Sequence, residues 1–107
     1  AEPASAKVTE AMQRIAGDRY AISRSSPCGL EIQDAEFTKG KSARFLADRL
    51  GAHTLICVGD YENDISMIRE ADIGCAVANA IPELKDVADR ILPRVDQDPF
   101  VELIYSL

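Results

Sequence analysis

Residues 54–64 read Thr-Leu-Ile-Cys-Val-Gly-Asp-Tyr-Glu-Asn-Asp, an apolar run that ends in an acidic turn. The first five residues, 54–58, carry no charge, which predicts a strand buried on both faces of a parallel sheet. Ligands of parallel α/β sheets bind beyond the carboxyl ends of the strands. The turn after Val58 is therefore where we look first for function.

Helical and strand-like patterns surround this strand. From residue 38 onward the sequence predicts strands at 54–58, 73–77 and 90–92, and helices at 39–50, 62–71, 82–88 and after Asp98-Pro99. Apolar residues share one face of the last helix: Phe100, Leu103, Ile104 and Leu107. Upstream, the spacing predicts a helix over 3–16 and an antiparallel pair at 20–25 and 30–33. The alternation is typical of an α/β fold with a mostly parallel sheet.

The composition excludes several functional classes. Twelve Lys and Arg stand against 18 Asp and Glu, so the net charge is −6, and no basic stripe interrupts the acidic surface. Such a surface disfavours nucleic-acid and membrane partners. The apolar run 55–58 is far shorter than a spanning helix of roughly 20 residues. Three cysteines, Cys28, Cys57 and Cys75, form no Cys-x-x-Cys pair, which indicates reduced thiols in a cytoplasmic protein. Cys57 and Cys75 stand in apolar runs and are expected in the core.

The acidic turn carries the strongest chemical signal. Asp60 leaves the strand tip and Asp64 lies one turn into the following helix, so both carboxylates can converge on one point. Clustered carboxylates repel each other unless a cation lies between them, and hard oxygen ligands suit Mg²⁺. The alternative is that Glu62, Asn63 and Asp64 cap the helix, which we accept for Glu62 alone.

A second signal is Thr38-Lys-Gly-Lys-Ser42 at the start of the helix predicted over 39–50, for which Thr38 is the expected cap. A helix start attracts anions, and Gly40 would let a phosphate approach the backbone beside Lys39. The plain alternative is a solvated lysine pair. A further alternative is a P-loop using Gly40, Lys41 and Ser42, although Ala35 stands at the leading glycine position and the preceding strand alternates in polarity.

Several motifs together resemble a known family. In order, the sequence carries Lys39-Gly40, the acidic turn 59–64, the Ala-Asp to Asn-Ala segment 71–80, Pro82-Glu-Leu-Lys85 and Ala88-Asp89. This combination resembles the carboxyl-terminal part of haloacid dehalogenase (HAD) superfamily phosphatases of the Cof-like, type-IIB branch. The resemblance covers about residues 30–107.

The resemblance implies a role for each matched residue. Lys39 would hold the transferring phosphoryl group, Asp60 would ligate Mg²⁺, and Asp64 would support the metal's waters or the lysine. Asn63 matches a phosphate contact, and Asn79 matches a polar position near the site. The implied substrate is a small phosphorylated metabolite, such as a sugar phosphate. Residues 1–34 would be a remnant of an α+β cap domain, and 35–107 the carboxyl-terminal half of a Rossmann-like HAD core.

One part of the family's site has no counterpart in the sequence. The family's reaction begins at an aspartate nucleophile in an Asp-x-Asp motif on an apolar strand, and no such strand is found. We therefore expect the nucleophile to come from a missing amino-terminal segment of the same protein. The isolated chain is predicted to be inactive. The alternative is a noncatalytic remnant or binding module that keeps the motifs as scaffold.

Overall fold

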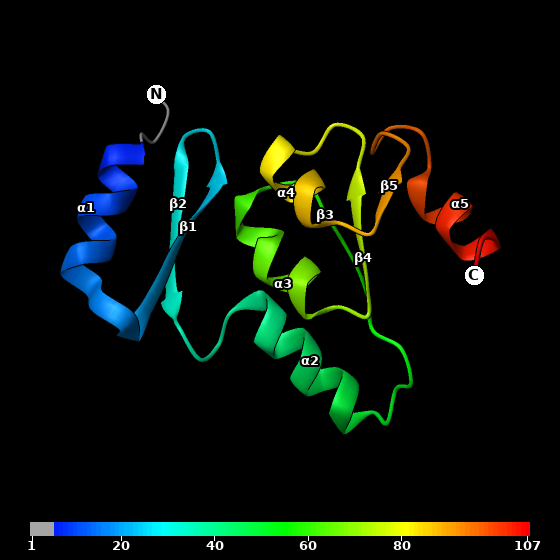
Figure 1. The fold of residues 1–107 in the computed structure, drawn as a ribbon, viewed down its shortest axis with the longest axis horizontal. Helices are drawn as coiled ribbons and strands as arrows, with labels where there is room; N and C mark the ends of the chain where they lie inside the picture. Colours follow the sequence, from blue (N-terminus) through cyan, green and yellow to red (C-terminus); the bar gives the residue numbers. More distant parts are fainter. Residues whose placement is uncertain (1–5) are drawn as a thin grey trace.

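The amino-terminal part of the chain forms a helix packed on a hairpin. The computed structural model describes residues 6–107, so the start of the helix predicted from residue 3 lies outside the described residues. Helix α1 (Ala6–Ala16) leads through a short 3-10 turn, η1 (Gly17–Arg19), into strands β1 (Tyr20–Ser26) and β2 (Gly29–Asp34). These strands pair antiparallel, as predicted, with Ile22 opposite Ile32 (Figure 1). Their apolar face meets α1.

The rest of the chain builds a parallel sheet flanked by helices (Figure 1). Strands β3 (Ile56–Gly59), β4 (Ile73–Val77) and β5 (Arg90–Leu92) lie in the order β3-β4-β5. The helices are α2 (Lys39–Arg49), α3 (Ile65–Glu70), α4 (Pro82–Val87) and α5 (Pro99–Tyr105), and the 3-10 turn η2 (Glu62–Asp64) precedes α3. The predicted α/β class is confirmed, and the carboxyl ends of all three strands meet at one edge.

The core has two parts of different size, one on each side of the sheet. On one side of the sheet, Cys57 and Ala76 pack against Ile68 of α3 and Leu84 of α4, and all four are buried. On the other side, Leu103 of α5 packs against two buried residues, Cys75 and Leu92. The predicted burial of Cys57 and Cys75 is confirmed, and no disulfide joins any two of the three cysteines. The larger part lies between the sheet and helices α3 and α4, and both helices contact the acidic turn.

Burial of β3 and α5 differs from the sequence expectation. Strand β3 begins at Ile56 and is not buried on both faces, because α5 covers only part of the second face and leaves Ile56 and Val58 half-buried. In α5, Leu103 is 5% exposed, whereas Phe100 and Ile104 are 57% and 67% exposed. Leu107 is exposed as well. Apolar residues that share a helical face need not all be buried, and of these four only Leu103 packs in the core.

Two helix starts also differ from the prediction. The predicted helix over 62–71 begins as the 3-10 turn η2 and becomes α-helical only at Ile65. Asp98 precedes α5, but its side chain makes no capping hydrogen bond and its backbone is left-handed, with φ at 51°. The sequence pattern places both helices correctly, while the tight acidic turn and the left-handed residue alter how each begins.

Asp72 ties α2 to the entry of β3. Its carboxylate accepts the N–H of Leu55 at 2.7 Å and bonds from Arg44 at 3.2 and 3.4 Å. These bonds, the one from Leu55 foremost, hold the pKa of Asp72 below its usual value. A carboxyl of this kind stabilises the fold above its unfolded pKa, and the contribution is lost as pH falls through the lower folded value.

We therefore expect Asp72→Asn to lower the melting temperature at pH 7. The same change should narrow the difference in melting temperature between pH 7 and pH 3, because the variant has no charge to lose at this position. Circular dichroism melts at both pH values measure this, with the exposed Asp86→Asn as a matched control. If both variants melt like the parent at pH 7, this account of Asp72 is wrong.

Candidate active site

Asp64 connects the acidic turn to the start of α2. One carboxylate oxygen, Oδ1, accepts a bond from the Lys39 ammonium at 2.8 Å. The other, Oδ2, accepts the backbone N–H of Asp60 at 3.1 Å and of Tyr61 at 3.4 Å. Asp64 is 8% exposed, and burial alone would oppose its ionisation. The bonds from Lys39 and the backbone outweigh burial and hold the pKa of Asp64 below its usual range.

Helix α2 carries Lys39 to this carboxylate because α2 and α3 lie very close together. The Thr38 hydroxyl accepts the N–H of Lys41 at 3.4 Å, which confirms the predicted helix cap. Gly40 is buried, and a Cβ there would lie 2.3 Å from the backbone oxygen of Ser66. The expected role of Gly40 in letting a phosphate approach is therefore wrong. Its missing side chain lets the two helices touch, and that contact places Lys39 beside Asp64.

The turn itself is folded back against β3. A Cβ at Gly59 would lie 2.6 Å from the Cβ of Asp64, so the last residue of β3 has room for hydrogen only. Asp60 follows at the strand tip with an exposed side chain. Partial burial and then the Asp64 carboxylate raise the pKa of Asp60, while Lys39 opposes that rise. The negative charge on Asp60 is thus poorly stabilised by its surroundings, and a nearby cation would improve its stability.

The donor set around Asp60 fits one kind of metal ion. Within residues 6–107, no three His, Cys, Asp or Glu side chains come together as a complete metal cluster. Mg²⁺ differs from most metals in needing only one or two carboxylates, since it keeps several waters. Asp60 and Asp64 fit such a site, although Asp64 already bonds to Lys39 and to two backbone N–H groups. Of the two residues, Asp60 is exposed and Asp64 is buried.

The two predicted asparagines lie at different places. Asn63 is half-buried in η2 and lines a cleft between the hairpin and the core. Asn79 is exposed in the turn after β4, and its side-chain oxygen accepts the N–H of Val95 at 3.0 Å. The structure thus brings Lys39, Asp60, Asn63 and Asp64 together. A substrate contact for Asn79 remains a prediction. In the structure, the Asn79 side chain holds the loop after β5.

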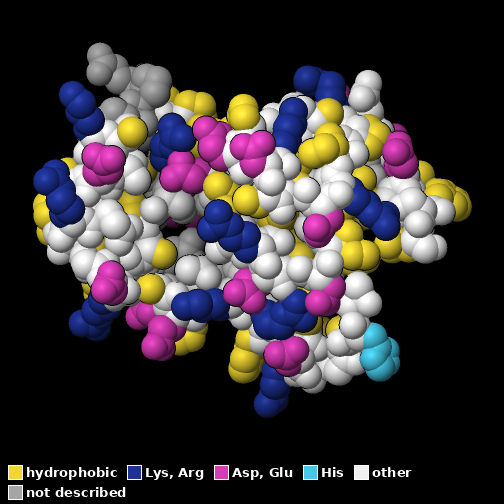
Figure 2. Space-filling model, in the orientation of Figure 1, with side chains coloured by type: hydrophobic (Ala, Val, Ile, Leu, Met, Phe, Trp, Pro, Cys, Tyr) yellow, Lys and Arg dark blue, Asp and Glu magenta, His cyan; other side chains and the backbone are white. Residues whose placement is uncertain are grey.

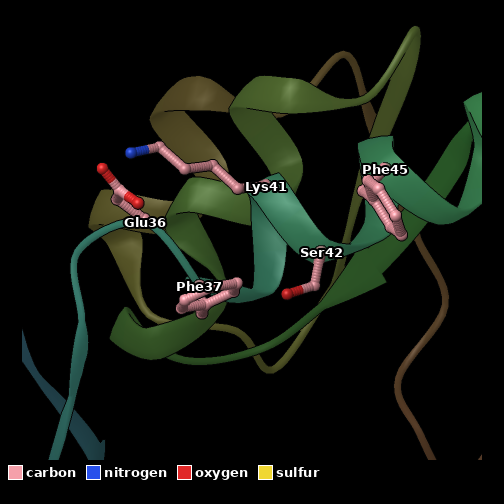
Figure 3. Close-up of a pocket in the computed structure, with 5 residues that line it drawn as sticks. All are labelled: Glu36, Phe37, Lys41, Ser42 and Phe45. Atoms are coloured by element: carbon pink, nitrogen blue, oxygen red, sulfur yellow. The ribbon is translucent and has the colours of Figure 1, made fainter.

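The P-loop alternative does not fit the structure. Strand β2, which precedes α2, belongs to the separate antiparallel hairpin instead of the parallel sheet. Lys41 donates to the carbonyl of Ala35 at 2.7 Å and so is held along the loop. Figure 3 shows Ser42 between the rings of Phe37 and Phe45, in a pocket of about 410 Å³. A pocket between two phenyl rings is unsuited to phosphate.

One contact at the site is missed by sequence reasoning. Arg24 of β1 forms an ion pair with Glu62 of η2, with Nε and Oε2 2.5 Å apart. The two residues are 38 positions apart, and no local pattern in the sequence relates them. Elsewhere, acidic and basic side chains are interspersed over the face in Figure 2, with no basic stripe there.

An acidic turn, a buried aspartate and a lysine from the neighbouring helix thus lie together at the carboxyl edge of a parallel α/β sheet. Residues 1–104 match the haloacid dehalogenase-like hydrolase family along nearly the whole chain. The chain belongs to that family, in its Cof-like group. The predicted resemblance is therefore confirmed.

Individual relatives agree with this assignment. A phosphoglycolate phosphatase from Archaeoglobus fulgidus is 45% identical over 78 residues, which cover 71% of this chain and 35% of that protein. A putative phosphatase from Bacillus subtilis, YxeH, is 42% identical over 74 residues, or 67% of this chain and 27% of that protein. The chain thus spans about a third of the length of these curated relatives.

Solved structures show the same architecture. A haloacid dehalogenase-like hydrolase from B. subtilis superposes with a TM-score of 0.85 at 25% identity, covering 96% of this chain and 38% of that one. The HAD subclass IIB sugar phosphatase BT4131 gives a TM-score of 0.74 at 28% identity, covering 82% of this chain and 35% of that one. Along residues 6–107, each helix is too short or too polar to cross a lipid bilayer.

Proposed function

We propose that this chain supplies the lysine and metal half of a Mg²⁺-dependent phosphomonoesterase site. The observation that carries the proposal is the 2.8 Å bond between Lys39 and Asp64 at the tip of β3. It places one cation and two carboxylates at the carboxyl edge of a parallel sheet, where ligands of such sheets bind. The residues that we assign to the reaction are Lys39, Asp60, Asn63 and Asp64, with Asn79 as a more distant substrate contact.

Each side chain has a separate task in this proposal. Lys39 attracts the phosphoryl oxygens and offsets their charge, and Asp64 orients its ammonium through the hydrogen bond at Oδ1. Asp64 also fixes the turn through the N–H groups of Asp60 and Tyr61, which points the Asp60 carboxylate outward. The Asn63 amide donates to a phosphate oxygen. This division of work needs no movement of the turn.

Mg²⁺ is the cofactor in this proposal, held by Asp60 with Asp64 behind it. When bound, the ion neutralises charge on the phosphoryl oxygens. The raised pKa of Asp60 supports its assignment as the ligand that needs a cation. The exposed position of Asp60 leaves room for the waters that Mg²⁺ retains.

The nucleophile is assigned to a missing amino-terminal segment of the same protein. Three observations support this. The chain spans about a third of the length of its curated relatives. Strand β3 is an edge strand of the sheet formed by residues 56–92. Phe37, just before α2, and Phe45, within α2, leave 69% and 67% of their surface exposed. A preceding strand that paired with β3 would carry its own carboxyl end next to Asp60. In this arrangement residues 1–34 are the end of a cap domain and 35–107 the second half of the core.

The substrate we propose is a small phosphorylated metabolite, a sugar phosphate or a similar phosphomonoester. The names of two relatives, a phosphoglycolate phosphatase and a subclass IIB sugar phosphatase, support this size class. The three cysteine thiols support a reducing, cytoplasmic location.

Complementation tests the proposal. The 107-residue chain is assayed with p-nitrophenyl phosphate and Mg²⁺, alone and together with the proposed amino-terminal segment, which is produced separately. We expect turnover only from the mixture, and loss of that turnover when EDTA removes the metal, because each piece holds half of the site.

Two results would refute this proposal. Turnover by the pure chain would show that the nucleophile is not elsewhere. A mixture that forms a stable complex by size-exclusion chromatography but hydrolyses nothing would instead establish the alternative, a noncatalytic remnant that retains its motifs as scaffold.

A further inference from the structure

The Arg24–Glu62 ion pair joins the hairpin to the acidic turn. Its atoms are 2.5 Å apart, and the two side chains are 33% and 25% exposed. The hydrogen bond to Glu62 raises the pKa of Arg24. Glu62 lies between Asp60 and Asp64 in the turn. The pair therefore connects β1 directly to the backbone segment that carries both candidate metal ligands.

A narrow cleft separates the hairpin from the core beside this pair. Its volume is about 90 Å³; the hairpin contributes Ala21, Ser23 and Gln33, and the core contributes Thr38, Glu62, Asn63 and Ser66. Thr38 precedes Lys39, and Asn63 precedes Asp64, so the cleft adjoins the candidate phosphoryl site. Ala21 lies opposite Gln33 in the hairpin register, so both belong to one face of the hairpin. The position of that face sets how wide the cleft is.

We propose that Arg24 is a positioning residue, whose ion pair with Glu62 holds the β1–β2 hairpin against the acidic turn and sets the approach to Lys39 and Asn63. Arg24 acts through Glu62 and need not touch the substrate. The consequence for catalysis rests on the proposed function, whereas the position of the hairpin does not. A half-exposed ion pair contributes modestly and is screened by salt.

A distance measurement in the 107-residue chain tests the positioning. Nitroxide labels are placed on Cys28, which is exposed in the hairpin turn, and on Asp86→Cys in α4, while Cys57 and Cys75 are buried. We expect one narrow distance distribution in the parent. Arg24→Gln and Glu62→Gln should each add a longer distance, with about a fivefold rise in the ratio of open to closed molecules. The exposed Arg14→Gln in α1 is the matched control for loss of one positive charge.

Charge exchange separates pairing from any other effect of these residues. The double variant Arg24→Glu with Glu62→Arg should restore the narrow distribution, since the pair reforms with its signs exchanged. A parent-like distribution in both single variants, with circular dichroism confirming that they are folded, would overturn the proposal. So would a double variant that stays as open as the singles.

The assembled enzyme provides a kinetic readout that a merely structural role would not reproduce. Arg24→Gln should raise KM for a small phosphomonoester about threefold and leave kcat nearly unchanged, and the exchanged pair should reverse this rise. A threefold fall in kcat with KM unchanged would contradict a positioning role. If neither parent nor variant hydrolyses anything, the proposed function has failed, and the distance measurement still decides whether Arg24 positions the hairpin.

Discussion

In the assembled enzyme, Asp60→Asn is expected to lower kcat/KM on the order of 100- to 1000-fold. The amide keeps the shape of the side chain but removes the charge that we assign to the metal. The fold should not suffer, because partial burial and Asp64 raise the pKa of Asp60 and so disfavour its charged form in the folded chain. We therefore expect the variant to melt at the parent's temperature or slightly above it.

The contrast between activity and stability makes this prediction specific. Asp86→Asn removes the same charge from an exposed position in α4 and should change neither quantity. Steady-state kinetics over a range of Mg²⁺ concentrations should show that excess metal does not restore Asp60→Asn. Parent-like kcat/KM in this variant would remove Asp60 from the site.

Gly40→Ala is expected to destabilise the 107-residue chain by about 1–3 kcal/mol. Alanine normally favours a helix over glycine by about 1 kcal/mol, so the expected sign is opposite to the helix propensity. The cause is the added Cβ, which would lie 2.3 Å from the backbone oxygen of Ser66 and 2.9 Å from the side chain of Glu70. The Glu70 side chain can move aside, whereas the backbone of α3 cannot do so without shifting the whole helix.

Urea unfolding measures this effect, with Ser42→Ala as the control in the same helix. Ser42 is exposed, so its replacement should leave the free energy of unfolding unchanged or slightly higher. A shift of α3 would also move Asp64 away from Lys39, so Gly40→Ala should reduce activity in the assembled enzyme. A variant as stable as the Ser42→Ala control would show that the two helices can separate freely.

Local patterns predict most of the architecture. The apolar strand at 73–77, the short strand at 90–92 and the amphipathic helix over 39–50 are read from neighbouring residues, and each is present in the structure. The same holds for the Thr38 cap and for the turn between β1 and β2. These features depend on interactions a few residues apart, which is the range that sequence periodicity reports.

Features that depend on distant partners are predicted poorly. Gly40 looks like a phosphate-binding glycine until the structure shows Ser66 against it. The apolar face of α5 predicts burial, yet the sheet offers room for Leu103 alone. The pairing of Arg24 with Glu62 has no sequence signal, since two charges 38 residues apart are not related by any period. In the site, Asp64 is found from the acidic turn and Lys39 from the start of its helix. The family resemblance offers the lysine as one of two partners of Asp64, and the structure shows their direct bond.

The place of β3 at the edge of the sheet has a consequence for how stiff the site is. Strand β4 is paired on both sides, but β3 is paired on one side within the three-stranded sheet. Amide hydrogens of edge strands exchange with solvent through small local openings, at lower free energy than those of central strands. The acidic turn directly follows the carboxyl end of this less protected strand. A segment that paired with the open edge of β3 would therefore slow amide hydrogen exchange in β3 and reduce the motion of the acidic turn at the same time.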